Sequence, residues 1–174
     1  MKKKRESKDA VILGIDPGFA RLGYALVVES GRALRLLAAS CVETPSGTSP
    51  AERLATIAAA IERVIRTHHP SVVAMEQLFF STNQKTAIRV AEVRGVILLL
   101  AAKNGLPVFE CTPLELKAAL TGYGAAPKAQ VQEMVKLLLR LPAVPKPDDV
   151  ADAIAVALTC AASAKMRTAE QRRA

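Results

Sequence analysis

The sequence predicts a mixed α/β domain in which one sheet is covered by helices. Short, continuously apolar, β-branched segments are typical of strands buried on both faces, and longer segments with apolar residues every three or four positions are typical of amphipathic helices. A run of three strand segments precedes an alternation of helices and strands, which is the order of a mixed sheet. At 174 residues, 51% of them hydrophobic, the chain has the length of one domain and can bury its own core.

The first third of the chain predicts three antiparallel strands. Residues 10–15 form a wholly apolar segment that ends at Asp16, and Pro17 and Gly18 turn the chain. Residues 22–29 and 33–42 are two further strand segments, joined by a short polar link. We therefore expect an antiparallel meander before the first helix.

The remainder predicts alternating helices and strands that belong to the same domain. Gly105 closes one of the helices, at a position that favours the left-handed conformation. The predicted helices are residues 51–67, 86–104, 113–120, 128–139 and a last one from about 148 past 160, and the predicted strands are 71–77 and 108–111. We expect a domain over residues 10–164, flanked by basic, flexible tails at 1–9 and 165–174.

The charge distribution favours a polyanionic partner. Lys and Arg number 24 against 16 Asp and Glu, so the formal net charge is +8. Each tail contributes +3, but within the domain residues 77–146 hold nine basic and four acidic groups, and residues 147–164 hold three acids and no base. Such a composition also fits a surface whose charges only keep the protein soluble. The choice between these two interpretations depends on sequence motifs.

Cysteine and histidine positions indicate neither a disulfide framework nor a zinc site. The three cysteines, Cys41, Cys111 and Cys160, are far apart and odd in number, which fits a reducing cytosol. His68 and His69 precede Pro70 and are expected at a surface helix end. No apolar segment has the length of a signal peptide core or a membrane span, so we expect a cytoplasmic protein.

Acidic residues lie at three positions in the sequence where a binding or catalytic site is expected. Asp16 and Glu76 each end an apolar strand, and ligands of open α/β sheets bind beyond the carboxyl ends of strands. A third acidic segment, residues 148–152, opens a helix that is otherwise apolar. Asp148 and Asp149 are suited to capping this helix, but Asp152 is a carboxylate on an apolar face, which is costly unless a cation meets it.

A shared metal site would explain why four acidic residues occur at these positions. The acid cluster, as we call it from here on, consists of Asp16, Glu76, Asp149 and Asp152. Four carboxylates in one pocket repel one another unless cations bind them, and oxygen ligands select hard ions such as Mg²⁺ or Mn²⁺. Such a site suits two-metal hydrolysis of phosphodiester bonds.

Three segments carry a family resemblance. GIDPGFARLGYA, AMEQLFFSTN and DDVADAIAVA resemble the signature segments of the RuvC family of bacterial Holliday-junction resolvases, over about residues 10–160. The resemblance implies a ribonuclease H-like fold, a homodimer, two Mg²⁺ ions per site, and paired symmetric nicks in four-way DNA junctions during homologous recombination and repair. It implies that the acid cluster is both catalytic and metal-binding, with Asp148 as an alternative third ligand.

The resemblance also implies DNA contacts. Family members carry an aromatic residue three positions after the strand glutamate that stacks on a base, here Phe79, with Phe80 as a near alternative. Lys117 and Lys128 correspond to residues that contact backbone phosphates in the family. Further phosphate candidates are Lys85, Arg89 and Arg94. Contact with the branch-migration proteins RuvA and RuvB is implied by the family alone.

Three other functions compete with this interpretation. A ribosomal-RNA-processing nuclease of the same superfold is the main alternative. An ATP-binding module of the actin and Hsp70 type shares the Asp-x-Gly turn but needs a second domain. A junction-binding protein with little or no catalytic activity would lack one of the four acids, and all four are present.

Overall fold

The computed structural model describes residues 9–31, 33–77 and 84–171, and for residues 84–86 and 165–171 it describes the backbone alone. Within these ranges five strands form one sheet in the order β3-β2-β1-β4-β5. The strands are β1 (Ala10–Asp16), β2 (Arg21–Ser30), β3 (Ala33–Glu43), β4 (Val72–Glu76) and β5 (Val108–Cys111). All five agree with the predicted segments to within one residue at either end.

The sheet is mixed, as predicted. β1 pairs antiparallel with β2, which in turn pairs antiparallel with β3, so the first three strands form the expected meander. On its other side β1 pairs in parallel with β4, and β4 pairs in parallel with β5. The strands that end in Asp16 and Glu76 are therefore direct neighbours.

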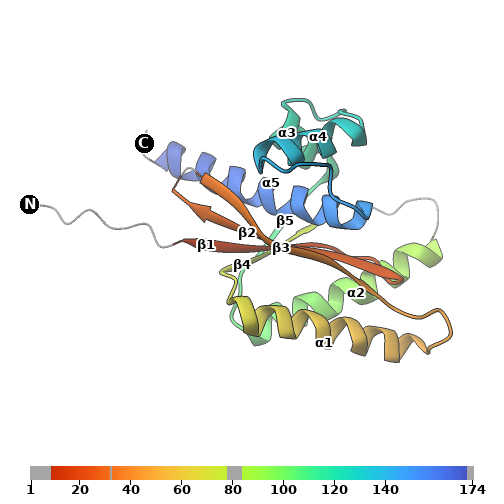
Figure 1. Cartoon of the computed structure of the whole chain (residues 1–174). Helices are drawn as coiled ribbons and strands as arrows, with labels where there is room; N and C mark the ends of the chain where they lie inside the picture. The colour runs from red at the N-terminus through yellow and green to blue at the C-terminus, as the bar shows by residue number, and fades with distance from the viewer. Residues whose placement is uncertain (1–8, 32, 78–83, 172–174) are drawn as a thin grey trace, which may run out of the picture.

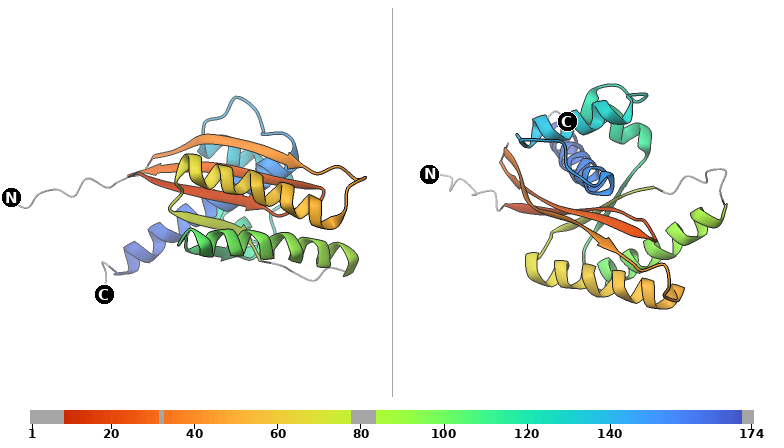
Figure 2. Two further views of the ribbon diagram at one scale, coloured as in Figure 1. Left: turned by 90° about the horizontal axis from the view of Figure 1, so that it is seen from below. Right: turned by 45° about the vertical axis from the view of Figure 1, so that its right-hand side comes forward.

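Helices cover both faces of this sheet (Figures 1 and 2). They are α1 (Pro50–His68), α2 (Gln84–Lys103), α3 (Pro113–Thr121), α4 (Lys128–Leu138) and α5 (Asp148–Gln171). α1 and α2 lie on one face, whereas α5 lies on the other, with α3 and α4 packed outside it. α5 runs beyond Ala164, where we expected the domain to end.

The central strands are buried on both faces, which explains their continuous apolar sequences. Along β1, Leu13 and Ile15 pack towards α1 and α2, whereas Ile12 packs towards α5. β4 repeats the pattern, with Met75 on the first face and Ala74 on the second. Side chains alternate with a period of two, so the residue that ends each strand faces α5.

Local sequence determines where the helices begin and end. Ser49 caps α1 through a capping box with Glu52, and Thr112 caps α3 through the same arrangement with Glu115. His69 closes α1 in the left-handed conformation, so both histidines lie at a helix end as predicted. No helix in the described part of the chain is both long and apolar enough to cross a membrane.

Candidate active site

Two strand ends bring the first pair of acids together. Asp16 ends β1 and Glu76 ends β4, each on the face that meets α5. Ile15 is paired with Met75 in the parallel register, so the two acids follow at the same level of the sheet. This arrangement is the one that the sequence predicted from strand ends alone.

Two glycines, one in β1 and one in β2, let α5 lie directly on the sheet. A β-carbon on Gly23 would lie 2.0 Å from the carbonyl oxygen of Asp149, and one on Gly14 would lie 2.2 Å from that of Ala153. Gly23 is paired with Asp16 across β1 and β2. The first turn of α5, which carries Asp149 and Asp152, is therefore held against the strand end that carries Asp16.

The electrostatics show that the four acids share one environment. The pKa of Asp16 is raised to about 7, first by burial and then by the charges of Asp152, Asp149 and Glu76. The pKa of Glu76 is also raised, first by burial and then by Asp152, while Lys117 and Lys128 act in the opposite direction. The four acids therefore lie near enough to influence one another, with two lysines beside them.

Basic side chains neutralise two members of the acid cluster. Lys128 Nζ lies 2.7 Å from Asp152 Oδ2, and Arg21 Nη2 lies 3.0 Å from Asp149 Oδ2. The approach of Arg21 is within ion-pair distance but does not form a hydrogen bond, so among the described residues the buried Asp149 Oδ2 has no hydrogen-bond partner. A buried carboxylate oxygen without a hydrogen bond is costly and is suited to accept a cation.

The donor set fits a hard divalent cation. Its ligands would all be carboxylate oxygens, which Mg²⁺ and Mn²⁺ prefer. In the described part of the chain no three Asp, Glu, His or Cys groups converge closely enough to hold a metal ion, and two of the four acids are instead engaged by Arg21 and Lys128. A metal ion at the acid cluster would therefore compete with Arg21 and Lys128 for these two carboxylates.

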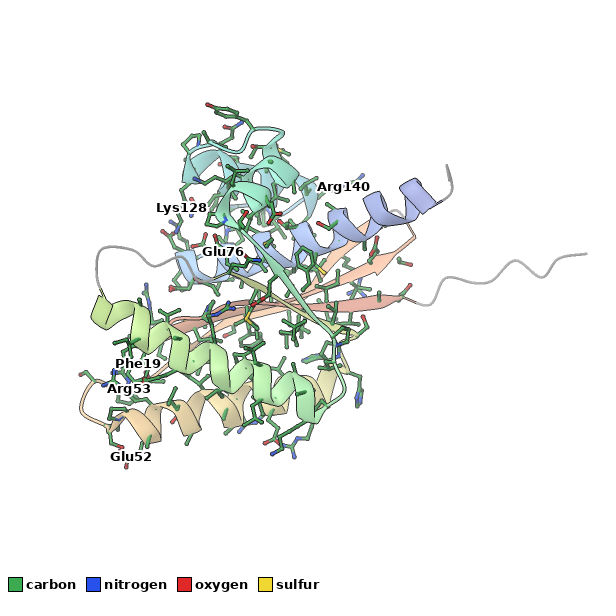
Figure 3. The ribbon with its side chains drawn as sticks, turned by 180° about the vertical axis from the view of Figure 1, so that it is seen from behind. Phe19, Glu52, Arg53, Glu76, Lys128 and Arg140 are labelled. Carbon is green, nitrogen blue, oxygen red and sulfur yellow. The ribbon has the colours of Figure 1, made fainter. Side chains whose placement is uncertain are left out.

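α3 and α4 bring the two predicted lysines to the site. A cavity of about 230 Å³ is lined by Glu76 and Asp152 together with Lys117 and Lys128. Glu76 and Lys128 lie on the side of the sheet that carries α4 and α5 (Figure 3). A polyanion entering this cavity would meet both lysines next to the acids.

The other candidate residues are not members of the acid cluster. Asp148, whose side chain is half exposed, lies 3.2 Å from Lys146 Nζ and 3.5 Å from Lys128 Nζ. Arg89 lies on the α1 and α2 side, where it pairs with Glu92. Phe79 and Phe80 lie outside the described residues, as does the side chain of Lys85.

Arg94 differs from its expected role as a phosphate ligand. Its side chain is buried and donates to the backbone carbonyl of Glu76 and to the carboxylate of Glu110. A guanidinium engaged in this way cannot reach a DNA strand. Arg94 instead fixes the end of β4, and with it the position of Glu76.

Arg21 and Gly23 both contact Asp149, and we predicted neither contact. A glycine inside a strand indicates that another backbone approaches closely, so the sequence did contain a signal for Gly23. The ion pair of Arg21 with Asp149 joins residues far apart in the chain, and no local pattern indicates it.

We expect the stability of the metal-free protein to fall as pH rises. Since the pKa of Asp16 is about 7 in the folded state and 3.8 when unperturbed, the folded chain holds a proton that the unfolded chain releases between these values. The free energy of unfolding should therefore decline from about pH 4 to above 7, by a few kcal/mol at most. Urea titrations with EDTA at about pH 5 and about pH 8 measure this decline.

Asp16→Asn should reduce that decline, because the amide does not titrate and the raised pKa of Glu76 then contributes what remains, whereas Asp148→Asn should retain it. Mg²⁺ should restore stability to the parent at the higher pH. An equal decline in Asp16→Asn and the parent would show that Asp16 does not carry the effect.

Sequence comparisons identify close relatives of this chain. The family described as crossover junction endodeoxyribonuclease RuvC matches residues 12–160. A crossover junction endodeoxyribonuclease RuvC of Moorella thermoacetica is 53% identical over 161 residues, covering 92% of this chain and 96% of the relative. The protein of that name from Heliobacterium modesticaldum is 54% identical over 153 residues, covering 88% and 94%.

Solved structures of RuvC proteins also resemble this chain. Thermus thermophilus RuvC is 37% identical with a TM-score of 0.85, and the same protein in complex with a Holliday junction substrate is 38% identical with a TM-score of 0.87. Each comparison covers 91% of this chain and 97% of the solved one. The yeast mitochondrial Holliday junction resolvase Ydc2, at 16% identity over 93% of this chain and 84% of its own, has a TM-score of 0.64 and shares the fold.

Proposed function

The chain belongs to the crossover junction endodeoxyribonuclease RuvC family, and we propose that it resolves four-way DNA junctions by paired, symmetric nicks in homologous recombination and repair. One observation carries this proposal beyond the family name: two strand ends and the first turn of α5 gather the acid cluster beside Lys117 and Lys128. A relative of known structure was solved in complex with a Holliday junction substrate, which supports the choice of substrate.

We propose that the acid cluster holds two Mg²⁺ ions, with Mn²⁺ as a substitute. Bound there, the ions would supply an activated water and would stabilise the leaving 3′ oxygen. Both acids pair with basic side chains, but Asp149 is the preferred third ligand because its Oδ2 is buried without a hydrogen bond and its charge acts on Asp16, whereas Asp148 is half exposed. Asp148 remains the alternative.

The lysines of the 230 Å³ cavity would bind the strand to be cut. Lys128 now neutralises Asp152, so a phosphate must draw its ammonium away from that carboxylate. Lys117 lies near Glu76, where it can hold a phosphate oxygen beside the acid cluster. Phe79, with Phe80 as its alternative, is proposed to stack on a base opened at the junction.

A nicking assay tests the proposed function. The substrates are a synthetic four-way junction, the matching linear duplex and a structured ribosomal RNA fragment, each incubated with Mg²⁺. We expect nicks at symmetric positions in two opposing strands of the junction and no cut in the duplex. Cleavage of the RNA without cleavage of the junction would favour the ribosomal-RNA-processing alternative, and binding without cleavage would favour a junction-binding protein.

We propose a homodimer, because one acid cluster cuts one strand and a junction offers two equivalent strands. The exposed face of α2 is the proposed interface: Ile88 and Leu99 are each 60% exposed and lie about three turns apart on the same face. A twofold axis across this face would place two acid clusters in one particle. Contact with RuvA and RuvB remains a prediction from the family.

We expect Leu99→Asp to shift the molar mass from dimer to monomer and to abolish paired nicking, because it places a charge in the interface. Light scattering after size exclusion measures the mass. Leu137→Asp is the matched control, since Leu137 is 63% exposed on α4, away from α2. A parent protein that is monomeric and fully active would refute the dimer.

A further inference from the structure

A second cavity flanks the acid cluster on the other side of Asp149. It has a volume of about 550 Å³ and is lined by the turn after β1, by Arg21, by Arg53 of α1, by Arg89 of α2 and by Asp149. We call it the arginine pocket. Phe19 and Arg53 lie on the α1 side of the sheet, whereas Glu76 and Lys128 lie on the α4 side (Figure 3). The acid cluster therefore has a basic cavity on either flank.

The arginines of this pocket are held in place without losing their charge. Arg53 donates from Nε to the buried hydroxyl of Thr44 at 2.8 Å and from Nη2 to the carbonyl of Phe19 at 3.2 Å. The guanidiniums of Arg53 and Arg89 lie 4.2 Å and 5.0 Å from the centre of the Phe19 ring. A cation over an aromatic face is attracted to it, but the ring carries no charge that would neutralise Arg53 or Arg89.

The pocket retains capacity for an anion. Three guanidiniums stand against two carboxylates, because Arg21 pairs with Asp149 and Arg89 pairs with Glu92. Each guanidinium has five N–H donors, and none of the three uses all of them in these contacts. Arg21 and Arg89 have side chains that are 51% and 43% exposed, so an incoming ligand can reach them.

We propose that the arginine pocket binds a backbone phosphate of the DNA strand whose neighbouring phosphate lies at the acid cluster. Arginine clusters recognise phosphate oxygens through paired N–H donors, and the position beside Asp149 suits a phosphate on the strand being cut. The strand would then be held on both flanks of the cutting site, by Lys117 and Lys128 on one side and by the arginine pocket on the other. This inference rests on the proposed function for its ligand.

The test measures junction affinity against salt concentration, in EDTA so that the DNA stays intact. Each phosphate bound by a basic side chain contributes about 0.9 to the slope of log affinity against log salt. We expect Arg89→Gln to weaken binding and to reduce the slope by about 0.9 for each phosphate that the side chain no longer binds. Arg63→Gln, which removes the same charge from an exposed position on α1, should leave the slope near that of the parent.

A double variant separates direct contact from a change in local charge. Arg89→Gln leaves Glu92 unpaired and so adds repulsion, whereas Arg89→Gln combined with Glu92→Gln keeps the net charge of the parent. We expect the reduced slope to persist in the double variant. Recovery of the parental slope there, or an unchanged slope in Arg89→Gln, would overturn the proposal.

Two further readouts identify the ligand and separate this proposal from the proposed function. If inorganic phosphate alone raises the melting temperature of the parent but not of Arg89→Gln, while the DNA slope is the same in both, the pocket is a small-anion site and the proposal fails. If the parent binds duplex as well as it binds the junction and cuts neither, the proposed function fails, yet the slope difference still reports on the arginine pocket.

Discussion

Asp149→Asn and Asp152→Asn are each expected to lower the rate of junction cleavage by orders of magnitude while junction binding is largely retained. The amide keeps the shape of the side chain but removes the charge that captures Mg²⁺ and fixes the geometry for water activation. DNA affinity comes from lysines and arginines, which both variants keep. Cleavage rates under single-turnover conditions and binding in EDTA measure the two effects separately.

The structure adds an expectation for the stability of these variants. Each substitution releases one cation, Arg21 or Lys128, and these side chains are 51% and 53% exposed, so water can solvate them. The carboxylates of the two ion pairs are 19% and 33% exposed, and the loss of each pair is offset because mutual repulsion with Asp16 is relieved at the same time. Melting temperatures without metal should therefore stay close to that of the parent, and Mg²⁺ should raise them less.

Asp148→Asn provides the internal control. Asp148 is half exposed and paired with Lys146 and Lys128, and asparagine serves the start of a helix nearly as well. We expect cleavage to persist. Retained cleavage in Asp149→Asn together with lost cleavage in Asp148→Asn would show that Asp148 is the third ligand, and retained cleavage in Asp152→Asn would refute the acid cluster as the catalytic site.

Gly23→Ala is expected to reduce both stability and cleavage, although no charge or hydrogen-bonding group changes. The added methyl group would lie 2.0 Å from the carbonyl oxygen of Asp149, which is backbone and cannot rotate away. The first turn of α5 must move, and overpacking of this kind costs on the order of 1 to 3 kcal/mol or more. Urea unfolding measures the stability, and the cleavage rate measures the displacement of Asp149 from Asp16.

Gly47→Ala is the matched control for this prediction. Nothing lies within 4 Å of a β-carbon at Gly47, and the same substitution there should leave stability and cleavage near those of the parent. If Gly23→Ala behaves like Gly47→Ala, the close approach of α5 to β2 does not determine the geometry of the acid cluster.

Much of the fold could be predicted from the sequence because hydrophobic periodicity and helix caps are local. The strand that ends at Asp16 and the strand that ends at Glu76 are both short apolar segments, and each is buried on both faces as such segments usually are. The gathering of the acids followed from the parallel pairing of β1 with β4, since both carboxyl ends then lie at one edge.

The contacts that neutralise and flank the acids could not be predicted in the same way. The pairing of Arg21 with Asp149 and the position of Arg53 against Phe19 depend on how helices are placed across the sheet. Arg94 shows the same limit, since its charge suggested a DNA contact while its burial against Glu76 and Glu110 depends on packing. A basic side chain looks the same in a sequence whether it meets solvent, DNA or a carboxylate.

The placement of α5 has a consequence for how the molecule could evolve or be redesigned. The helix that carries Asp149 and Asp152 also supplies Ile154 and Leu158 to the centre of one core, and Gly14 and Gly23 allow no spacer between this helix and the sheet. A shift of α5 would therefore disrupt the core as well as the acid cluster. Changes that raise heat resistance are best sought in the opposite layer, around Ile57 and Ile61 of α1, because no member of the acid cluster lies on that helix.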